Sequence, residues 1–129
     1  MEPSRCVIDS SVFVAFYRDI DVLHADALRI MQRLSTATFI VHPYVIQETA
    51  TVLAYGSGLS VAKQFLVDVT TASNITIPNL DIQRDIQLFL NSRAKLSFTD
   101  VALVGLAKEM GIPLITFDRK MLTLSKKFV

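Results

Sequence analysis

Short apolar runs alternate along this chain with longer segments in which apolar residues recur every three or four positions. The short runs are rich in β-branched and aromatic residues, as in buried strands, and the longer segments have the period of amphipathic helices. The predicted strands are residues 5–8, 38–42, 74–78 and 112–117. The predicted helices are residues 12–17, 23–35, 43–56, 59–72, 81–93 and 100–110.

Strands that are separated by helical segments throughout predict a parallel sheet, because parallel neighbours must be joined by a crossover that is usually helical. Such a sheet is covered by helices on both faces. We therefore expect the α/β class, as a three-layer α/β/α sandwich with a central parallel sheet of four to five strands. The length of 129 residues fits one domain. Residues 1–129 are interpreted as that single domain.

Composition adds an apolar bias without a membrane segment. The mean hydropathy is +0.43, yet no apolar run approaches the roughly 18 residues that a membrane helix needs. The high apolar content fits strands that are apolar on both faces, and also an exposed apolar surface to which a partner binds. Cys6, the single cysteine, cannot form an internal disulfide, and the first residues lack a signal-peptide pattern. We expect a cytoplasmic protein that does not enter a membrane.

A helix that begins with Asp100 and a strand that ends at Asp118 form a tight reversal. Gly111 stops the helix, and Pro113 suits the first position of a strand. About eleven helical residues at 1.5 Å advance roughly 16 Å, and about five strand residues at 3.3 Å return the same distance. Asp118 is therefore predicted to come back to the level of Asp100.

Four acidic residues are predicted to meet at one edge of the sheet. In an open parallel sheet, strand ends and the following helix starts share the edge where ligands bind. Asp9 ends the first strand, and Glu48 lies early in the helix after the second. Asp100 and Asp118 reach the same edge by the reversal above. If the first and fourth strands are neighbours where the strand order reverses, Asp9 and Asp118 flank the crevice directly.

Clustered carboxylates repel one another unless a cation compensates. Oxygen ligands without nearby His or Cys favour Mg²⁺ or Mn²⁺ over zinc. His24 and His42 show no ligand spacing and are interpreted as surface or strand-end residues. The four acids are thus predicted to hold a divalent ion that orients water and neutralises charge on a phosphodiester.

Each acid also has a purely structural explanation. An Asp before a helix is often only an N-cap, Glu48 alone suits a solvated helix face, and Asp118 before Arg119 suits a turn. Thr116 either satisfies a backbone group or bonds a carboxylate ligand. The convergence of all four acids favours the functional interpretation over four separate coincidences.

Four segments together carry a resemblance to a known family. They read V-I-D-S-S-V-F-V-A (7–15), P-Y-V-I-Q-E-T-A-T-V-L (43–53), L-S-F-T-D-V-A-L-V-G-L-A-K-E-M-G (96–111) and P-L-I-T-F-D (113–118). In this order and spacing the set resembles a PIN domain. The compact length is similar to that of VapC-type toxins, the ribonuclease halves of toxin–antitoxin pairs.

The resemblance implies Mg²⁺- or Mn²⁺-dependent RNA cleavage at the four acids, with Ser10 and Thr116 as supporting polar residues. It also implies a homodimer and inhibition by a small antitoxin that covers the site. The chain stops eleven residues beyond Asp118, so the family's final edge strand is expected to be short or missing. Leu103 and Val104 occupy positions where some relatives carry a further acid, which argues against a full second metal site.

The charge distribution suits this hypothesis. The net charge is only +1, but without the four acids 13 basic residues face 8 acidic ones, a net +5. Lys95, Arg119 and Lys120 are candidate phosphate contacts. A non-catalytic PIN-like domain that binds RNA or acts as a scaffold remains an alternative. A phosphoacceptor signalling domain shares the gross fold, but Ser10-Ser11 stand where it needs an acidic pair.

Overall fold

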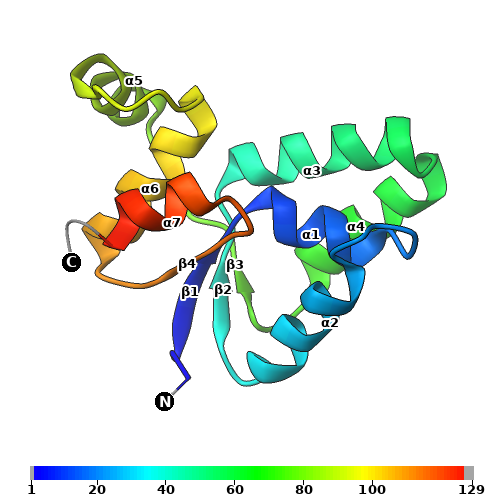
Figure 1. The fold of residues 1–129 in the computed structure, drawn as a ribbon. Helices are drawn as coiled ribbons and strands as arrows, with labels where there is room; N and C mark the ends of the chain where they lie inside the picture. The colour runs from blue at the N-terminus through cyan, green and yellow to red at the C-terminus, as the bar shows by residue number, and fades with distance from the viewer. Residues whose placement is uncertain (1, 127–129) are drawn as a thin grey trace.

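The computed structural model describes residues 2–126, which form four strands and seven helices (Figure 1). The strands are β1 (Arg5–Ile8), β2 (Thr38–Ile40), β3 (Ile75–Thr76) and β4 (Leu114–Ile115). The helices are α1 (Ser10–Tyr17), α2 (His24–Arg33), α3 (Pro43–Gly56), α4 (Leu59–Thr71), α5 (Ile82–Asn91), α6 (Phe98–Met110) and α7 (Arg119–Lys126). All six predicted helices and all four predicted strands are present.

The sheet is parallel throughout, with the strand order β3-β2-β1-β4. The central residue Val7 pairs with Ile40 on one side and with Leu114 on the other. The chain steps outward from β1 to β3 and then crosses back to place β4 beside β1, so the strand order reverses between β1 and β4. Helices α1 to α4 lie on one side of the sheet and α6 and α7 on the other (Figure 1). This arrangement confirms the predicted α/β/α sandwich.

The core forms on both faces of β1, whose residues Cys6, Val7 and Ile8 are fully buried. Burial on both faces explains the continuous apolar run, since a parallel strand covered by two helical layers has no solvated side. Helix α6 supplies one layer with six buried residues, which are Val101, Ala102, Leu103, Val104, Leu106 and Ala107. A helix buried on this much of its surface fixes the position of Asp100 in its first turn.

Helix α5 is attached differently from the other helices. Its only buried residue is Asp85, whereas its large apolar side chains Ile82, Phe89 and Leu90 are 42–69% exposed. In Figure 1, α5 stands beyond the end of the sheet, next to α6. The helix is therefore held mainly through α6 and through one acidic side chain.

The chain after Asp118 differs from expectation. The sequence showed no helical signal there that we recognised, but residues 119–126 form α7, which packs against α6 and β4. The family's final edge strand was expected to be short or missing, and residues 119–126 contain no strand because they are helical; residues 127–129 lie outside the described part. The fourth strand is also shorter than the predicted 112–117. Within residues 2–126, no helix has the length and apolar character needed to cross a membrane.

Gly111 makes the reversal between α6 and β4 possible. It is the C-cap of α6 with φ +67°, in the left-handed region, and its N–H donates to the carbonyls of Ala107 and Lys108. A Cβ at this position would meet nothing within 4 Å. The preference for glycine is therefore conformational and not steric.

We predict that Gly111→Ala lowers the free energy of unfolding by about 1–2 kcal/mol, the cost of a left-handed conformation for a residue with a Cβ. Gly111→Asn should lose less, because Asn tolerates this region better. Urea denaturation measures both. Gly56→Ala is the matched control, since Gly56 has no positive φ and its added Cβ makes only ordinary contacts at 3.7 Å or more. Equal losses at the two glycines would contradict the explanation.

Candidate active site

Asp9 lies at the point where β1 ends and α1 begins, between β1 and β4. Its side chain is 5% exposed, and its N–H donates to the carbonyl of Ile115 at 3.0 Å. Its Oδ1 accepts a hydrogen bond from the N–H of Ser10 at 2.8 Å, so Asp9 is the N-cap of α1. The structural interpretation of Asp9 as a cap is thus correct, but it accounts for only one of the two carboxylate oxygens.

Two hydroxyl groups hold the other oxygen of Asp9. Thr116 Oγ1 donates to Oδ2 at 2.7 Å and Ser11 Oγ donates to it at 2.8 Å. Each hydroxyl in turn accepts a backbone N–H, from Asp118 at 3.0 Å and from Phe117 at 3.1 Å. The hydroxyls therefore relay backbone dipoles to the carboxylate and fix its orientation. Both alternatives considered for Thr116 are therefore present, a bond to a backbone group and a bond to a carboxylate. The role of Ser11 was missed beside its neighbour Ser10.

Asp118 lies immediately after β4 and caps α7. Its Oδ1 accepts from the N–H groups of Lys120 at 2.9 Å and Met121 at 3.2 Å. The side chain is exposed, and its backbone N–H is tied to Thr116 as described above. Asp118 is thus joined to Asp9 through a single threonine hydroxyl.

Asp100 occupies the first turn of α6. Its N–H donates to the hydroxyl of the N-cap Ser97 at 3.1 Å. The pKa of Asp100 is raised, first by burial and then by the charges of Asp9 and Asp118, while hydrogen bonds with Ser97 oppose the shift. The carboxylate of Asp100 therefore lies within the field of both acids of the β1–β4 edge.

Glu48 comes from the second turn of α3 and points to the same place. It is half-buried, and burial is the largest cause of its raised pKa. A hydrogen bond with the Ser10 side chain opposes the shift, and the charges of Asp9 and Asp100 add to it. The Ser10 hydroxyl also donates to Asp9 Oδ1 at 3.4 Å, so Ser10 lies beside both acids, and Glu48 is not a freely solvated helix residue.

The four acids thus form one electrostatic group at the edge where the strand order reverses. Within residues 2–126, however, no three His, Cys, Asp or Glu side chains are close enough to hold a metal ion as they stand. The donor chemistry fits a hard divalent cation, because every candidate ligand is a carboxylate and their repulsion is what a cation would relieve. The group is a set of candidate ligands that side-chain rotation would have to bring closer.

The candidate phosphate contacts lie next to Asp118. Lys120 Nζ donates to the backbone carbonyl of Lys95 at 2.8 Å, which brings the start of α7 against the segment before α6. Lys95, Arg119 and Lys120 are all exposed. Cationic side chains from two segments therefore border the acidic edge on the α6–α7 side.

Two hollows on the surface lie away from the acids. One of about 590 Å³ is lined by α5, α6, the segment between them and Leu124. The other, of about 500 Å³, lies between residues 111–114 and α7. None of the four acids lines either hollow, so these two hollows are separate from the candidate site.

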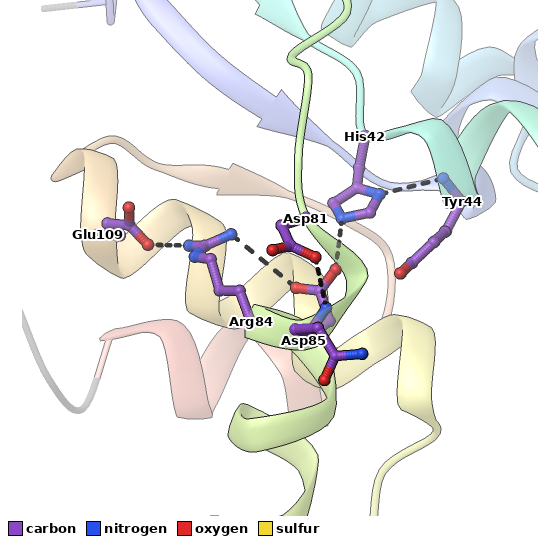
Figure 2. A network of polar contacts seen from close by, with 7 residues as sticks. His42, Tyr44, Asp81, Arg84, Asp85 and Glu109 are labelled. Carbon is purple, nitrogen blue, oxygen red and sulfur yellow. Dashed lines mark hydrogen bonds and ion pairs between the residues drawn. The ribbon is translucent and has the colours of Figure 1, made fainter.

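A second polar group, missed at the sequence level, lies at the start of α3 (Figure 2). His42 does follow β2, as expected for a strand-end residue, but it is only 1% exposed and is not at the surface. Its Nε2 lies 3.4 Å from Oδ2 of Asp85, which is also 1% exposed. His42 was interpreted as a surface or strand-end residue, and Asp85 occupied a polar position of an amphipathic helix, so the burial of neither was predicted. A His directly before Pro43 at a helix start was the one available signal, since that position is an N-cap.

The fold and the acidic edge define an α/β protein whose candidate site lies at the reversal of strand order. The PIN domain family model matches residues 6–127, so the chain belongs to the PIN domain family. The fold is similar to the crystal structure of the Mycobacterium tuberculosis toxin VapC20, described as cleaving the sarcin–ricin loop. The TM-score is 0.81 at 18% sequence identity, covering 96% of each chain. No curated protein matches the sequence. The family and the fold that the sequence indicated are confirmed.

Burial of the Glu48 carboxylate, together with the charges of its neighbours, makes a testable contribution to stability. A carboxyl whose pKa is raised in the folded state binds protons more readily there than in the unfolded chain. The raised pKa therefore lowers the free energy of unfolding at pH values above the pKa of the folded state. This loss disappears below the pKa of the unfolded chain, near 4.3. Glu48→Gln, with chelator present, should therefore raise the free energy of unfolding at pH 7 by up to about 1 kcal/mol, as for partly exposed charges.

Urea denaturation at pH 7 and at about pH 3.5 measures this gain, which should shrink towards zero at the lower pH. Asp19→Asn, at an exposed position between α1 and α2, is the control and should change stability little at either pH. A larger gain for Glu48→Gln in acid than at neutral pH would show that the sign of the pKa shift is wrong.

Proposed function

We propose that this protein is a divalent-metal-dependent endoribonuclease of the VapC type, the toxin of a toxin–antitoxin pair. The observation that carries the proposal is the electrostatic coupling of Asp9, Glu48, Asp100 and Asp118 at the switch point of a PIN-family fold. The toxin assignment rests on the fold shared with VapC20. An RNA substrate would place the activity in the cytoplasm.

The four acids would hold one Mg²⁺ or Mn²⁺ ion, which supplies water activation and charge stabilisation when bound. Asp9 is already oriented by the hydroxyls of Ser11 and Thr116, and the Ser10 hydroxyl also donates to it. Leu103 and Val104 are buried, so they add no ligand for a second ion. The remaining carboxylate lone pairs can accept the proton of an attacking water as it reaches the phosphorus in line.

Lys95, Arg119 and Lys120 would bind the phosphates that flank the scissile bond. Cationic side chains position the backbone of a nucleic acid without reading its sequence. Their place beside Asp118 would draw the strand across the open acidic edge. A small antitoxin that covers the same edge would inhibit cleavage, as the family resemblance implies.

We also propose a homodimer formed through an apolar surface on α3 and α4. Its members are exposed by 37–91% and are Val52, Tyr55, Leu59, Leu66 and Val67. Large apolar side chains gathered on two adjacent helices are typical of a protein interface. This α3–α4 surface is the face that the apolar composition and the family resemblance together favour.

Variants of the acids should lose RNA cleavage but keep RNA binding. Asp100→Asn and Asp118→Asn keep the size of the side chain and remove the charge that would hold the cation. Each should reduce Mg²⁺- or Mn²⁺-dependent cleavage of single-stranded RNA by at least about 100-fold, the scale for loss of one charge-stabilising group. Affinity for the same RNA should change little, because the phosphate contacts are elsewhere.

The assay compares both variants with wild type, with metal and with chelator. Asp81→Asn is the matched control, because Asp81 also caps a helix through Oδ1 but lies on α5. Undiminished cleavage in both variants would reject the site. Wild-type binding without cleavage across a broad RNA panel would favour the non-catalytic PIN-like alternative.

The proposed dimer predicts which single charge disrupts assembly. Tyr55→Glu places a carboxylate in the α3–α4 surface and should give a monomer, whereas Leu90→Glu on the exposed face of α5 should leave a dimer. Sedimentation at tens of micromolar decides between them. A monomeric wild type would reject the dimer, and dissociation by Leu90→Glu alone would move the interface to α5.

A further inference from the structure

His42 is both the end of the segment after β2 and the N-cap of α3. Its Nδ1 accepts the N–H of Tyr44 at 3.0 Å, which satisfies one of the free donors of the first turn. The imidazole is buried, and burial lowers its pKa while Asp85 opposes that shift. A neutral ring that accepts through Nδ1 must carry its proton on Nε2. That N–H faces Asp85 Oδ2 at 3.4 Å (Figure 2).

Stability alone does not explain why a carboxylate lies at this position. The two oxygens of Asp85 are buried and have no hydrogen-bond partner of normal geometry among the described residues. The contacts are long: His42 Nε2 lies at 3.4 Å and Arg84 Nη1 at 3.9 Å. A buried ionic contact of this kind is often no more stabilising than apolar residues of similar volume. A buried acid that contributes little stability calls for another explanation.

The geometry connects this pair to the two helices, α3 and α6, that carry Glu48 and Asp100 of the candidate site. His42 starts α3, and Glu48 follows in its second turn. On the other side, Arg84 of α5 pairs with Glu109 of α6, the helix whose first turn contains Asp100. Figure 2 shows these side chains as one continuous chain of contacts from α3 through α5 to α6.

The starts of α3 and α6 also touch directly. The rings of Tyr44 and Phe98 pack with centroids 5.8 Å apart, and Phe98 packs on Phe89 of α5 at 5.6 Å. Tyr44 precedes Glu48 by one helical turn, and Phe98 precedes Asp100 by two residues. A rotation or shift of the α3 start would therefore move Glu48 relative to Asp100.

We propose that Asp85 and His42 are positioning residues, which lock the start of α3 so that Glu48 faces Asp100 and Asp9 across the candidate metal site. The inference rests on the proposed function. Asp85 fixes the Nε2–H tautomer, the tautomer leaves Nδ1 free to cap α3, and the cap sets the rotation of the helix that carries Glu48. Outer residues that orient ligands in this way commonly change metal affinity about 10–100-fold when replaced.

The first test needs no metal. Nitrogen-15 spectra of the imidazole should show His42 as the Nε2–H tautomer in the wild type. In Asp85→Asn the tautomers should mix, because an amide can either accept or donate, and amide exchange over residues 44–48 should accelerate at least about tenfold, as a cap is lost. An Nδ1–H tautomer in the wild type, or unchanged exchange in the variant, would overturn the proposal.

The second test measures Mn²⁺ affinity by titration, with thermal melting as the measure of stability. Asp85→Asn should weaken Mn²⁺ binding about 10–100-fold while the midpoint of melting stays near that of the wild type. Asp85→Leu removes the hydrogen-bond acceptor and leaves no carboxylate at the buried position. It replaces Asp85→Asn in this test if Asp85→Asn folds poorly. Asp81→Asn removes a charge from the same helix and should leave the affinity unchanged.

The outcomes separate the two proposals. Wild-type affinity for Mn²⁺ in both Asp85 variants would show that the pair only packs α5 against the fold. A wild type that binds no Mn²⁺ and cleaves no RNA would overturn the proposed function, and the exchange measurement would still decide whether Asp85 holds α3. If Asp81→Asn weakened Mn²⁺ binding as much as Asp85→Asn does, any lost negative charge on this segment would have the same effect, and the positioning role of Asp85 would be rejected.

Discussion

Repulsion between carboxylates brought together at one edge of a sheet is the constraint on which the rest of this structure depends. Each acid is fixed by a different means. Asp9 is enclosed by a backbone N–H and two hydroxyls, Asp118 is tied down by the first turn of α7, and Asp100 is held by a largely buried helix. Burial and mutual charge raise the pKa values of Asp100 and Glu48. The protein tolerates this arrangement because rigid elements converge there.

Capping and function prove compatible in the same side chain. Asp9 and Asp118 each use Oδ1 to cap a helix, which was the structural explanation available from the sequence. A carboxylate has about four lone-pair sites, so the two capping hydrogen bonds on Asp118 Oδ1 leave its Oδ2 available to a cation. Asp9 accepts hydrogen bonds on both oxygens, so a cation would have to compete with them. A cap at these positions is therefore no argument against a functional role.

The sequence predicted those features that depend on local pattern and topology. The succession of strands and helices predicted the parallel sheet. The position of β4 beside β1 was only a condition of the site prediction, and the structure meets it and brings Thr116 to Asp9. The features that it did not predict depend on contacts between distant segments. Ser11 looked like any residue of a helix start, and Asp85 looked like part of the solvated face of an amphipathic helix. Helix α7 has only two buried residues, and its pattern was too short to recognise.

The shortness of the two outer strands has a consequence for solubility. β3 and β4 are the edges of the sheet, and each has only two paired residues. A long exposed edge offers a row of free backbone groups on which another chain can add a strand, and from which fibrils grow. The edge strands of this protein offer an incoming strand too few free backbone groups to form a stable hydrogen-bonded pairing. A chain that is 51% hydrophobic can thereby keep its apolar strands buried while its sheet edges offer little to another strand.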